Sequence, residues 1–161
     1  MFSNLSVDPA LAKKKNRLKI LKKSDENNDI ETCPQENINQ LINLYNEKKF
    51  LLVIEYAQAL SKRYPKSFTI WNILAISKSK IQLFDEAIEA YKKVLLINPN
   101  YAETYNNMGN AFTNQGKFDK AIETYKKALL INPHYPEALN NIGTVLKKQG
   151  KLNNSLEYYK K

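Results

Sequence analysis

Few side chains in this sequence could support catalysis. His134 is the single histidine and Cys33 the single cysteine. A general base or a metal ligand needs oriented polar partners, and none is visible around His134 in the run 132–136. A thiol nucleophile needs a histidine beside it, yet Cys33 and His134 are far apart in the chain. We therefore expect no catalytic residue, no metal site and no cofactor.

Carboxylates recur together with lysines at helical spacing in the second half of the chain. Side chains three or four residues apart on a helix are neighbours, so opposite charges at that spacing form exposed ion pairs. We interpret these residues as solvated helix faces and not as an acid–base pair. They are Asp85, Glu86, Glu89, Asp119 and Glu123, with Lys92, Lys93, Lys126 and Lys127.

The chain carries a large positive charge. Its 161 residues include 25 Lys and Arg against 16 Asp and Glu, which gives a formal net charge of +9 at pH 7. Such a charge invites a nucleic-acid or anionic-membrane partner. However, Arg17 and Arg63 are the only arginines, and proteins that read base edges and phosphates favour the arginine fork. The joint abundance of Lys, Asn and Ile is also typical of an AT-rich genome, so we expect the partner not to be nucleic acid.

The sequence also indicates a cellular compartment. A lone Cys33 can form no internal disulfide, which fits a reducing environment. Residues 1–6 lack the basic region and apolar core of a secretory signal. The chain contains no apolar run of the roughly 18 residues that a membrane-spanning helix needs. We expect a cytoplasmic protein.

A repeat of 34 residues organises most of the chain. Residues 68–101 match residues 102–135 at 15 of 34 positions, where chance would give about two, and such a period is the signature of a stacked repeat array. Each unit in an array buries its apolar face only against its neighbours. The recurring positions are Asn72, Asn106 and Asn140, Pro65, Pro99 and Pro133, and Gly109 and Gly143.

Each repeat is predicted to contain two helices joined by a tight turn. In the third unit, apolar residues at three-and-four spacing predict helices over 101–114 and 118–131. Gly116 suits the left-handed residue that ends a helix, and Asn132-Pro133 ends the second helix, because the residue before a proline disfavours the helical region. We expect units at 34–67 (degenerate), 68–101, 102–135 and 136–161 (truncated). They follow a mobile basic leader and polar linker at 1–33, in which Asp8-Pro9 could open a short helix.

The repeat resembles the tetratricopeptide repeat family. The third unit follows the family pattern almost completely, whereas the second departs at Lys78, where an aromatic residue is usual. The resemblance covers residues 34–161 and implies an all-α, right-handed solenoid of helix-turn-helix repeats. The residues that carry it are Tyr105, Met108, Gly109, Phe112, Ala121, Tyr125, Ala128 and Pro133, then Trp71, Leu74, Ala75, Ala87, Tyr91, Val94 and Pro99, and finally Ile142, Gly143, Leu146 and Tyr159.

The register of the repeat leads to two further expectations. Gly109 and Gly143 are small where the paired helices would cross, so Gly109→Leu should cost about 1–3 kcal/mol through overpacking. The fourth unit stops at Lys161 without a closing proline or the polar cap that arrays generally carry. We therefore expect the N-terminal part of a longer protein. Its uncovered last apolar face, with Leu152 and Leu156, would be an edge for self-association.

In tetratricopeptide arrays the first helices line a concave groove where ligands lie. An asparagine amide can donate to and accept from a peptide backbone at once, so asparagines in register could hold an extended segment. The alternative is that Asn is simply common here, as at Asn153 and Asn154. The resemblance predicts partner-binding residues Asn72, Ile76, Glu103, Asn106, Asn107, Asn110, Asn140, Asn141, Thr144 and Lys148, with Ser79 and Asn114 beside them.

The asparagine pattern is also similar to the repeat domain of O-linked N-acetylglucosamine transferases, whose interior carries Asn in successive units. Asn107 and Asn141 match that ladder, and Ile73 interrupts it. The leading expectation is a protein–protein interaction module or scaffold that holds an extended peptide or partner segment. The second is the substrate-binding arm of a larger glycosyltransferase whose catalytic domain lies beyond this chain. The third is self-assembly through the last repeat.

Overall fold

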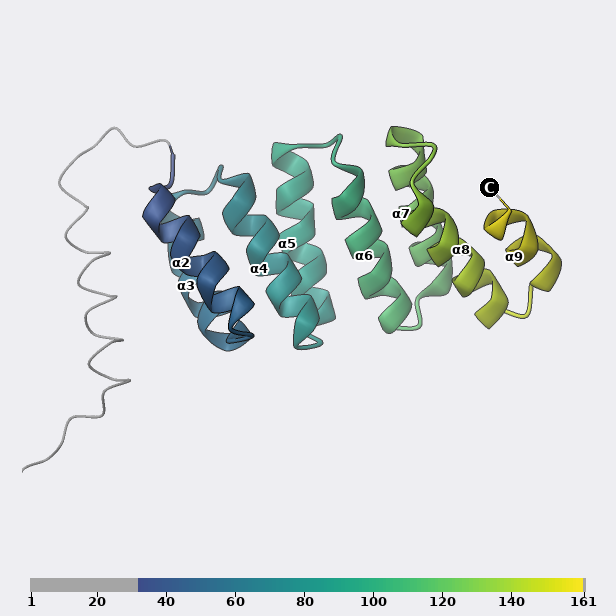
Figure 1. Cartoon of the computed structure of the whole chain (residues 1–161), viewed down its shortest axis with the longest axis horizontal. Coiled ribbons are helices and arrows are strands. Elements are labelled where there is room, and N and C mark those ends of the chain that lie inside the picture. Colours follow the sequence, from purple (N-terminus) through teal and green to yellow (C-terminus); the bar gives the residue numbers. More distant parts are fainter. Residues whose placement is uncertain (1–31, 161) are drawn as a thin grey trace, which may run out of the picture. The chain divides into compact units, whose positions relative to one another are not determined.

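The computed structural model describes residues 32–160, which form eight helices and contain no strand. The helices follow one another in chain order along a single array (Figure 1). Residues 1–31 of the leader and linker predicted at 1–33, with the helix at Asp8-Pro9, lie outside the described residues. The helices are α2 (Gln35–Asn46), α3 (Phe50–Arg63), α4 (Phe68–Lys80), α5 (Phe84–Ile97), α6 (Ala102–Asn114), α7 (Phe118–Ile131), α8 (Pro136–Lys148) and α9 (Leu152–Tyr159).

The helices pair as the sequence predicted for the third unit. The predicted segments 101–114 and 118–131 correspond to α6 and α7, with Tyr101 as the residue before the first helical turn. The second helix ends as expected, since Asn132 before Pro133 has the extended backbone angles φ −128° and ψ 93°.

The turns inside the four helix pairs share one conformation. The prediction for Gly116 is confirmed, because its φ is 71°, and the next N–H, of Lys117, donates back to the carbonyl of Phe112 at 2.9 Å. Glycine adopts a positive φ without steric cost, whereas a residue with a Cβ is strained there. The equivalent residues of the first two units are nevertheless Lys48, with φ 57°, and Gln82, with φ 63°.

Small residues line the contact inside the second, third and fourth helix pairs. Ala87 of α5 and Ala121 of α7 occupy equivalent positions and are fully buried. Ser155 of α9 fills the next equivalent position, where its hydroxyl donates to the carbonyl of Gly143 at 2.8 Å. Larger side chains fill the space between these contacts; they include Leu41, Leu60, Ile70, Leu74, Tyr91, Val94, Tyr125 and Ile142.

The two helical glycines make room for tyrosine rings. A Cβ added to Gly109 would lie 2.5 Å from Cε1 of Tyr125, and one added to Gly143 would lie 2.6 Å from Cε1 of Tyr159. The nearest obstacle is therefore the aromatic ring from the second helix of the same unit, and not the backbone of a crossing helix. With the rings in these positions, the hydroxyl of Tyr125 contacts side chains of α6 and the hydroxyl of Tyr159 contacts a side chain of α8.

Lys78 of α4 is buried where the family pattern has an aromatic side chain. Only 8% of the residue is exposed, and its Nζ donates to Oε2 of Glu86 on α5 at 2.8 Å. The carboxylate of Glu86 reaches water, since 55% of its side chain is exposed. The pair thus compensates one buried charge with one solvated charge.

We expect Glu86→Gln to lower the free energy of unfolding by about 1–2 kcal/mol, because it leaves a buried ammonium without a carboxylate. Lys78→Met should be close to neutral, since it keeps the apolar stem and leaves Glu86 in water. Urea unfolding followed by circular dichroism measures both. Glu89→Gln is the matched control, because its ion pair with Lys92 is exposed on both sides and should contribute under about 0.5 kcal/mol. Equal losses for the two glutamine variants would contradict this account.

Candidate functional site

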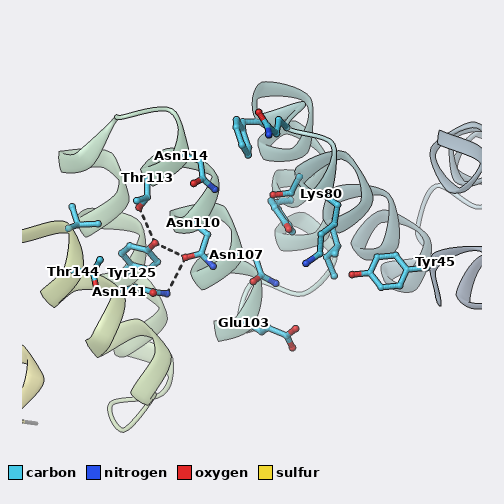
Figure 2. Close-up of a pocket in the computed structure, with 16 residues that line it drawn as sticks. Tyr45, Lys80, Glu103, Asn107, Asn110, Thr113, Asn114, Tyr125, Asn141 and Thr144 are labelled. Carbon is cyan, nitrogen blue, oxygen red and sulfur yellow. Dashed lines mark hydrogen bonds between the residues drawn. The ribbon is translucent and has the colours of Figure 1, made fainter. Parts of the chain in front are cut away.

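The first helices of the four pairs line a groove of about 790 Å³ (Figure 2). Helices α4, α6 and α8 supply most of its wall, and Tyr91 and Tyr125 reach it from the second helices α5 and α7. A volume of several hundred Å³ is typical of sites that enclose part of a ligand. The lining residues are Tyr45, Ile76, Ser79, Lys80, Gln82, Phe84, Tyr91, Glu103, Asn107, Asn110, Thr113, Asn114, Tyr125, Asn141, Thr144 and Val145.

Hydrogen bonds between side chains join α6, α7 and α8 along this groove (Figure 2). The Nδ2 of Asn141 donates to Oδ1 of Asn106 at 2.9 Å and to Oδ1 of Asn110 at 3.1 Å. The hydroxyl of Tyr125 donates to the same Oδ1 of Asn110 at 2.7 Å and lies 3.0 Å from Oγ1 of Thr113. These bonds fix the amide planes of Asn110 and Asn141 before any ligand arrives.

Two amides in this network, those of Asn110 and Asn141, each leave one polar group unpaired. Within residues 32–160, Nδ2 of Asn110 and Oδ1 of Asn141 have no hydrogen-bond partner. The whole amide of Asn107, two residues before Gly109 of α6, is likewise not hydrogen-bonded in that part of the chain and is partly exposed. The groove therefore offers an unpaired donor, an unpaired acceptor and one amide without any hydrogen bond, all within two successive repeats.

Two groove tyrosines, Tyr91 and Tyr125, have a raised pKa. Burial raises the pKa of Tyr125 above its ordinary value, in spite of the hydrogen bond with Thr113. Burial also raises the pKa of Tyr91, and the nearby Tyr45 and Glu103 add to that shift. Both phenols stay protonated at neutral pH, so the Tyr125 hydroxyl remains able to orient Asn110.

Charge is scarce in the groove although the chain is strongly basic. Lys80 and Glu103 are the charged residues among those that line it. Glu103 is held by the hydroxyl of Tyr101, which donates to its Oε2 at 2.7 Å and whose pKa is raised by that bond. The groove thus presents uncharged amides and hydroxyls between one cation and one anion, and the excess of lysines lies elsewhere.

Six of the ten residues predicted to bind a partner line this groove. The other four lie apart from its lining for different reasons. Asn106 is only 6% exposed and accepts a hydrogen bond from Nδ2 of Asn141. Asn72 has a buried Oδ1 that lacks a partner among the described residues. Asn140 and Lys148 are exposed and do not belong to the lining. The six that line it are Ile76, Glu103, Asn107, Asn110, Asn141 and Thr144.

The sequence pattern did not assign the tyrosines to the groove. Tyr91 and Tyr125 read as residues that fill space between units, and their rings do so, being 2% and 1% exposed. Their hydroxyls nevertheless reach the groove, because Gly109 leaves room for the Tyr125 ring above α6. One sequence feature could have predicted this arrangement. A helical glycine is followed 16 residues later by a tyrosine, at Gly109 and Tyr125 and again at Gly143 and Tyr159.

The residues first considered for chemistry lie outside the groove. His134 is exposed in the loop before α8, and burial raises the pKa of the Cys33 thiol, which disfavours the thiolate. Glu89 pairs with Lys92 at 2.6 Å and Glu123 with Lys127 at 2.8 Å on exposed helix faces. In the described part of the chain, no three His, Cys, Asp or Glu side chains gather as metal ligands would.

None of the helices described is both long and apolar enough to cross a bilayer.

Comparisons with known proteins identify the repeat. A family model described as a TPR repeat matches residues 82–116 and 109–150, so tetratricopeptide repeats are present there. A crystal structure of MamA superposes with a TM-score of 0.78 at 22% sequence identity, over 97% of this chain and 93% of that one. Residues 41 to the end of MamA from Desulfovibrio magneticus RS-1 superpose with a TM-score of 0.75 at 16% identity, over 94% and 86%. No curated protein sequence matches the chain.

These similarities concern the fold. They confirm the prediction of an all-α solenoid built from tetratricopeptide-like repeats. At identities of 22% and below, the similarities do not indicate which ligand the groove binds.

Proposed function

We propose that this chain is a protein-interaction module whose groove holds an extended peptide segment of a partner without chemical turnover. Arrays of tetratricopeptide repeats serve protein–protein interaction, which supports the general role. The observation that carries the specific proposal is the pair of oriented amides, Asn110 with a free donor and Asn141 with a free acceptor. An extended peptide presents alternating N–H and C=O groups, and such a pair complements one peptide unit.

The charge of the groove favours a peptide over nucleic acid. A phosphate backbone requires several cations along its path, whereas Lys80 is the single cation among the lining residues and Glu103 opposes it. A peptide main chain carries no net charge and is matched by amides and hydroxyls. The proposed ligand is therefore an uncharged or weakly charged extended segment, recognised mainly through its backbone.

A selection from random dodecapeptides displayed on phage tests this proposal. The native chain should enrich binders, and the affinity for an enriched peptide should fall at least about tenfold in the triple variant Asn107→Ala, Asn110→Ala, Asn141→Ala, since each lost hydrogen bond contributes about 0.5–1.5 kcal/mol. Asn106 is left intact because it is buried. The control triple variant, Asn140→Ala, Asn153→Ala, Asn154→Ala, changes exposed asparagines away from the lining and should bind as the native chain does. Equal affinities for all three proteins would refute the role of the groove amides.

The transferase-arm alternative and the cellular location are separate parts of the proposal. The transferase-arm alternative is favoured by Asn107 and Asn141, which line one groove a single repeat apart, and opposed by Ile73 at the equivalent position of α4. Reading the gene beyond codon 161 for a sugar-nucleotide-binding domain decides it. A cytoplasmic site of action is proposed from the lone Cys33.

A further inference from the structure

Two highly exposed leucines stand on the outside of the array. Leu96 of α5 and Leu130 of α7 occupy equivalent repeat positions and are 78% and 83% exposed. No other large hydrophobic residue in the described part of the chain is so exposed. Neither leucine lines the groove. A single exposed leucine is ordinary in a soluble protein, so the recurrence one repeat apart needs the support of its surroundings.

The surroundings of both leucines are basic in the same way. Lys92 and Lys93 precede Leu96 by four and three residues, and Lys126 and Lys127 precede Leu130 by the same intervals. At that spacing the lysines lie on the leucine side of each helix, and all four are exposed. We call these six residues the Leu–Lys edge.

Carboxylates do not cancel the charge of the Leu–Lys edge. The nearby Glu89 and Glu123 each engage one lysine, Lys92 at 2.6 Å and Lys127 at 2.8 Å. Lys93 and Lys126 form no ion pair with any residue in 32–160. Ion pairs exposed on both sides are weak, so an anionic surface can recruit all four ammonium groups.

The Leu–Lys edge lies near the carboxyl ends of α5 and α7. The loops that follow these helices run along the same side of the array (Figure 1). Leu96 and Leu130 therefore lie on one side of the array, in neighbouring repeats. A surface that bound this side would contact both leucines, neither of which lines the groove.

We propose that the Leu–Lys edge docks the protein onto an anionic lipid surface. Each lysine near a negatively charged bilayer strengthens binding, and the long lysine stems let the ammonium groups stay among the headgroups while leucine enters the acyl boundary. Two leucines separated by a repeat and surrounded by charge suit a deformable bilayer better than the continuous apolar core of a protein interface. Docked in this way, the chain would present its groove beside a membrane.

Vesicle sedimentation with the full chain tests the proposal. The chain should bind vesicles of phosphatidylcholine with phosphatidylserine and not vesicles of phosphatidylcholine alone. The double variant Leu96→Ser, Leu130→Ser should lower the partition coefficient at least about tenfold, and Lys93→Gln with Lys126→Gln should lower it about tenfold or more. Leu51→Ser is the matched control, because Leu51 is 72% exposed but is the second residue of α3, near the amino end of its helix, whereas Leu96 and Leu130 lie near the carboxyl ends of theirs. It should bind as the native chain does.

Three outcomes would overturn the proposal. Absence of binding to the anionic vesicles is the first. Binding that both double variants retain is the second, since it would assign the attraction to other basic residues, such as those in 13–23. Capture by soluble polyglutamate but not by vesicles is the third, and would indicate an acidic protein partner. Peptide affinity of the groove should stay unchanged in every variant, so failure here leaves the proposed function untouched.

Discussion

Gly109→Leu is expected to lower the free energy of unfolding by about 3 kcal/mol, the upper part of the range for overpacking in a core. A Cβ alone at this position would stand 2.5–2.9 Å from three carbon atoms of the Tyr125 ring, and the remaining leucine atoms need still more space. The ring would have to leave its place, and the hydroxyl would then lose its bonds with Asn110 and Thr113. Urea unfolding of the variant measures the loss.

A second variant separates this mechanism from the general cost of placing leucine in a helix pair. Tyr125→Ala removes the ring and leaves a cavity, which itself costs about 3–5 kcal/mol. In that background Gly109→Leu should be stabilising, because the leucine fills the vacated space and has a better helix propensity than glycine. The opposite signs in the two backgrounds are the diagnostic result. The same loss in both would mean that the obstacle is the backbone of the neighbouring helix.

Gly109 also shows which features of the fold can be predicted from the sequence. Spacing alone located the glycine, the helix pair 101–114 and 118–131 and the turn at Gly116, because local backbone chemistry and a fixed period determine all three. It did not identify the obstacle at Gly109, since a period does not specify rotamers. It also did not reveal that Lys48 and Gln82 take the left-handed conformation of Gly116. There the packing of the flanking helices overrides the local preference against it.

The groove was harder to predict than the fold. The repeat places Asn106 and Asn107 side by side on α6, and the sequence cannot say which of the two faces a ligand. In the structure Asn107 lines the groove, while Asn106 is buried under Asn141. A helix turns by about 100° per residue, so neighbouring positions have different roles. The hydrogen bonds that orient Asn110 come from α7 and α8, which no short-range pattern reports.

The proposed binding depends on which polar groups the network uses and which it leaves unpaired. Tyr125 and Asn106 contribute their polar groups inward and hold Asn110 and Asn141 in place. A ligand therefore meets amides that have already lost their side-chain freedom, so that binding costs less entropy. The same bonds stabilise the array, and a variant that reverses their polarity should damage folding and binding together.

Asn141→Asp is the variant that reverses this polarity most directly. The native Nδ2 donates to two oxygens, Oδ1 of Asn106 at 2.9 Å and Oδ1 of Asn110 at 3.1 Å. A carboxylate in its place would direct an oxygen at both acceptors. We expect the free energy of unfolding at pH 7 to fall by about 1–3 kcal/mol, the cost of leaving buried polar groups unsatisfied. Thermal unfolding measured by circular dichroism reports it. Asn140→Asp, at an exposed neighbouring position on α8, is the control and should change stability by less than about 0.5 kcal/mol.

The pH dependence makes the Asn141→Asp prediction specific. Facing two acceptor oxygens, the new carboxyl should have a pKa raised above the ordinary value of about 3.9, since only its protonated form can donate a hydrogen bond. The folded state then binds the proton more tightly than the unfolded state does, so the variant should approach native stability below about pH 4 and lose it as the pH rises through the raised pKa. A difference from the native chain that stays constant between pH 4 and pH 7 would contradict this, and would mean that Asn106 and Asn110 turn their amides to donate to the carboxylate instead.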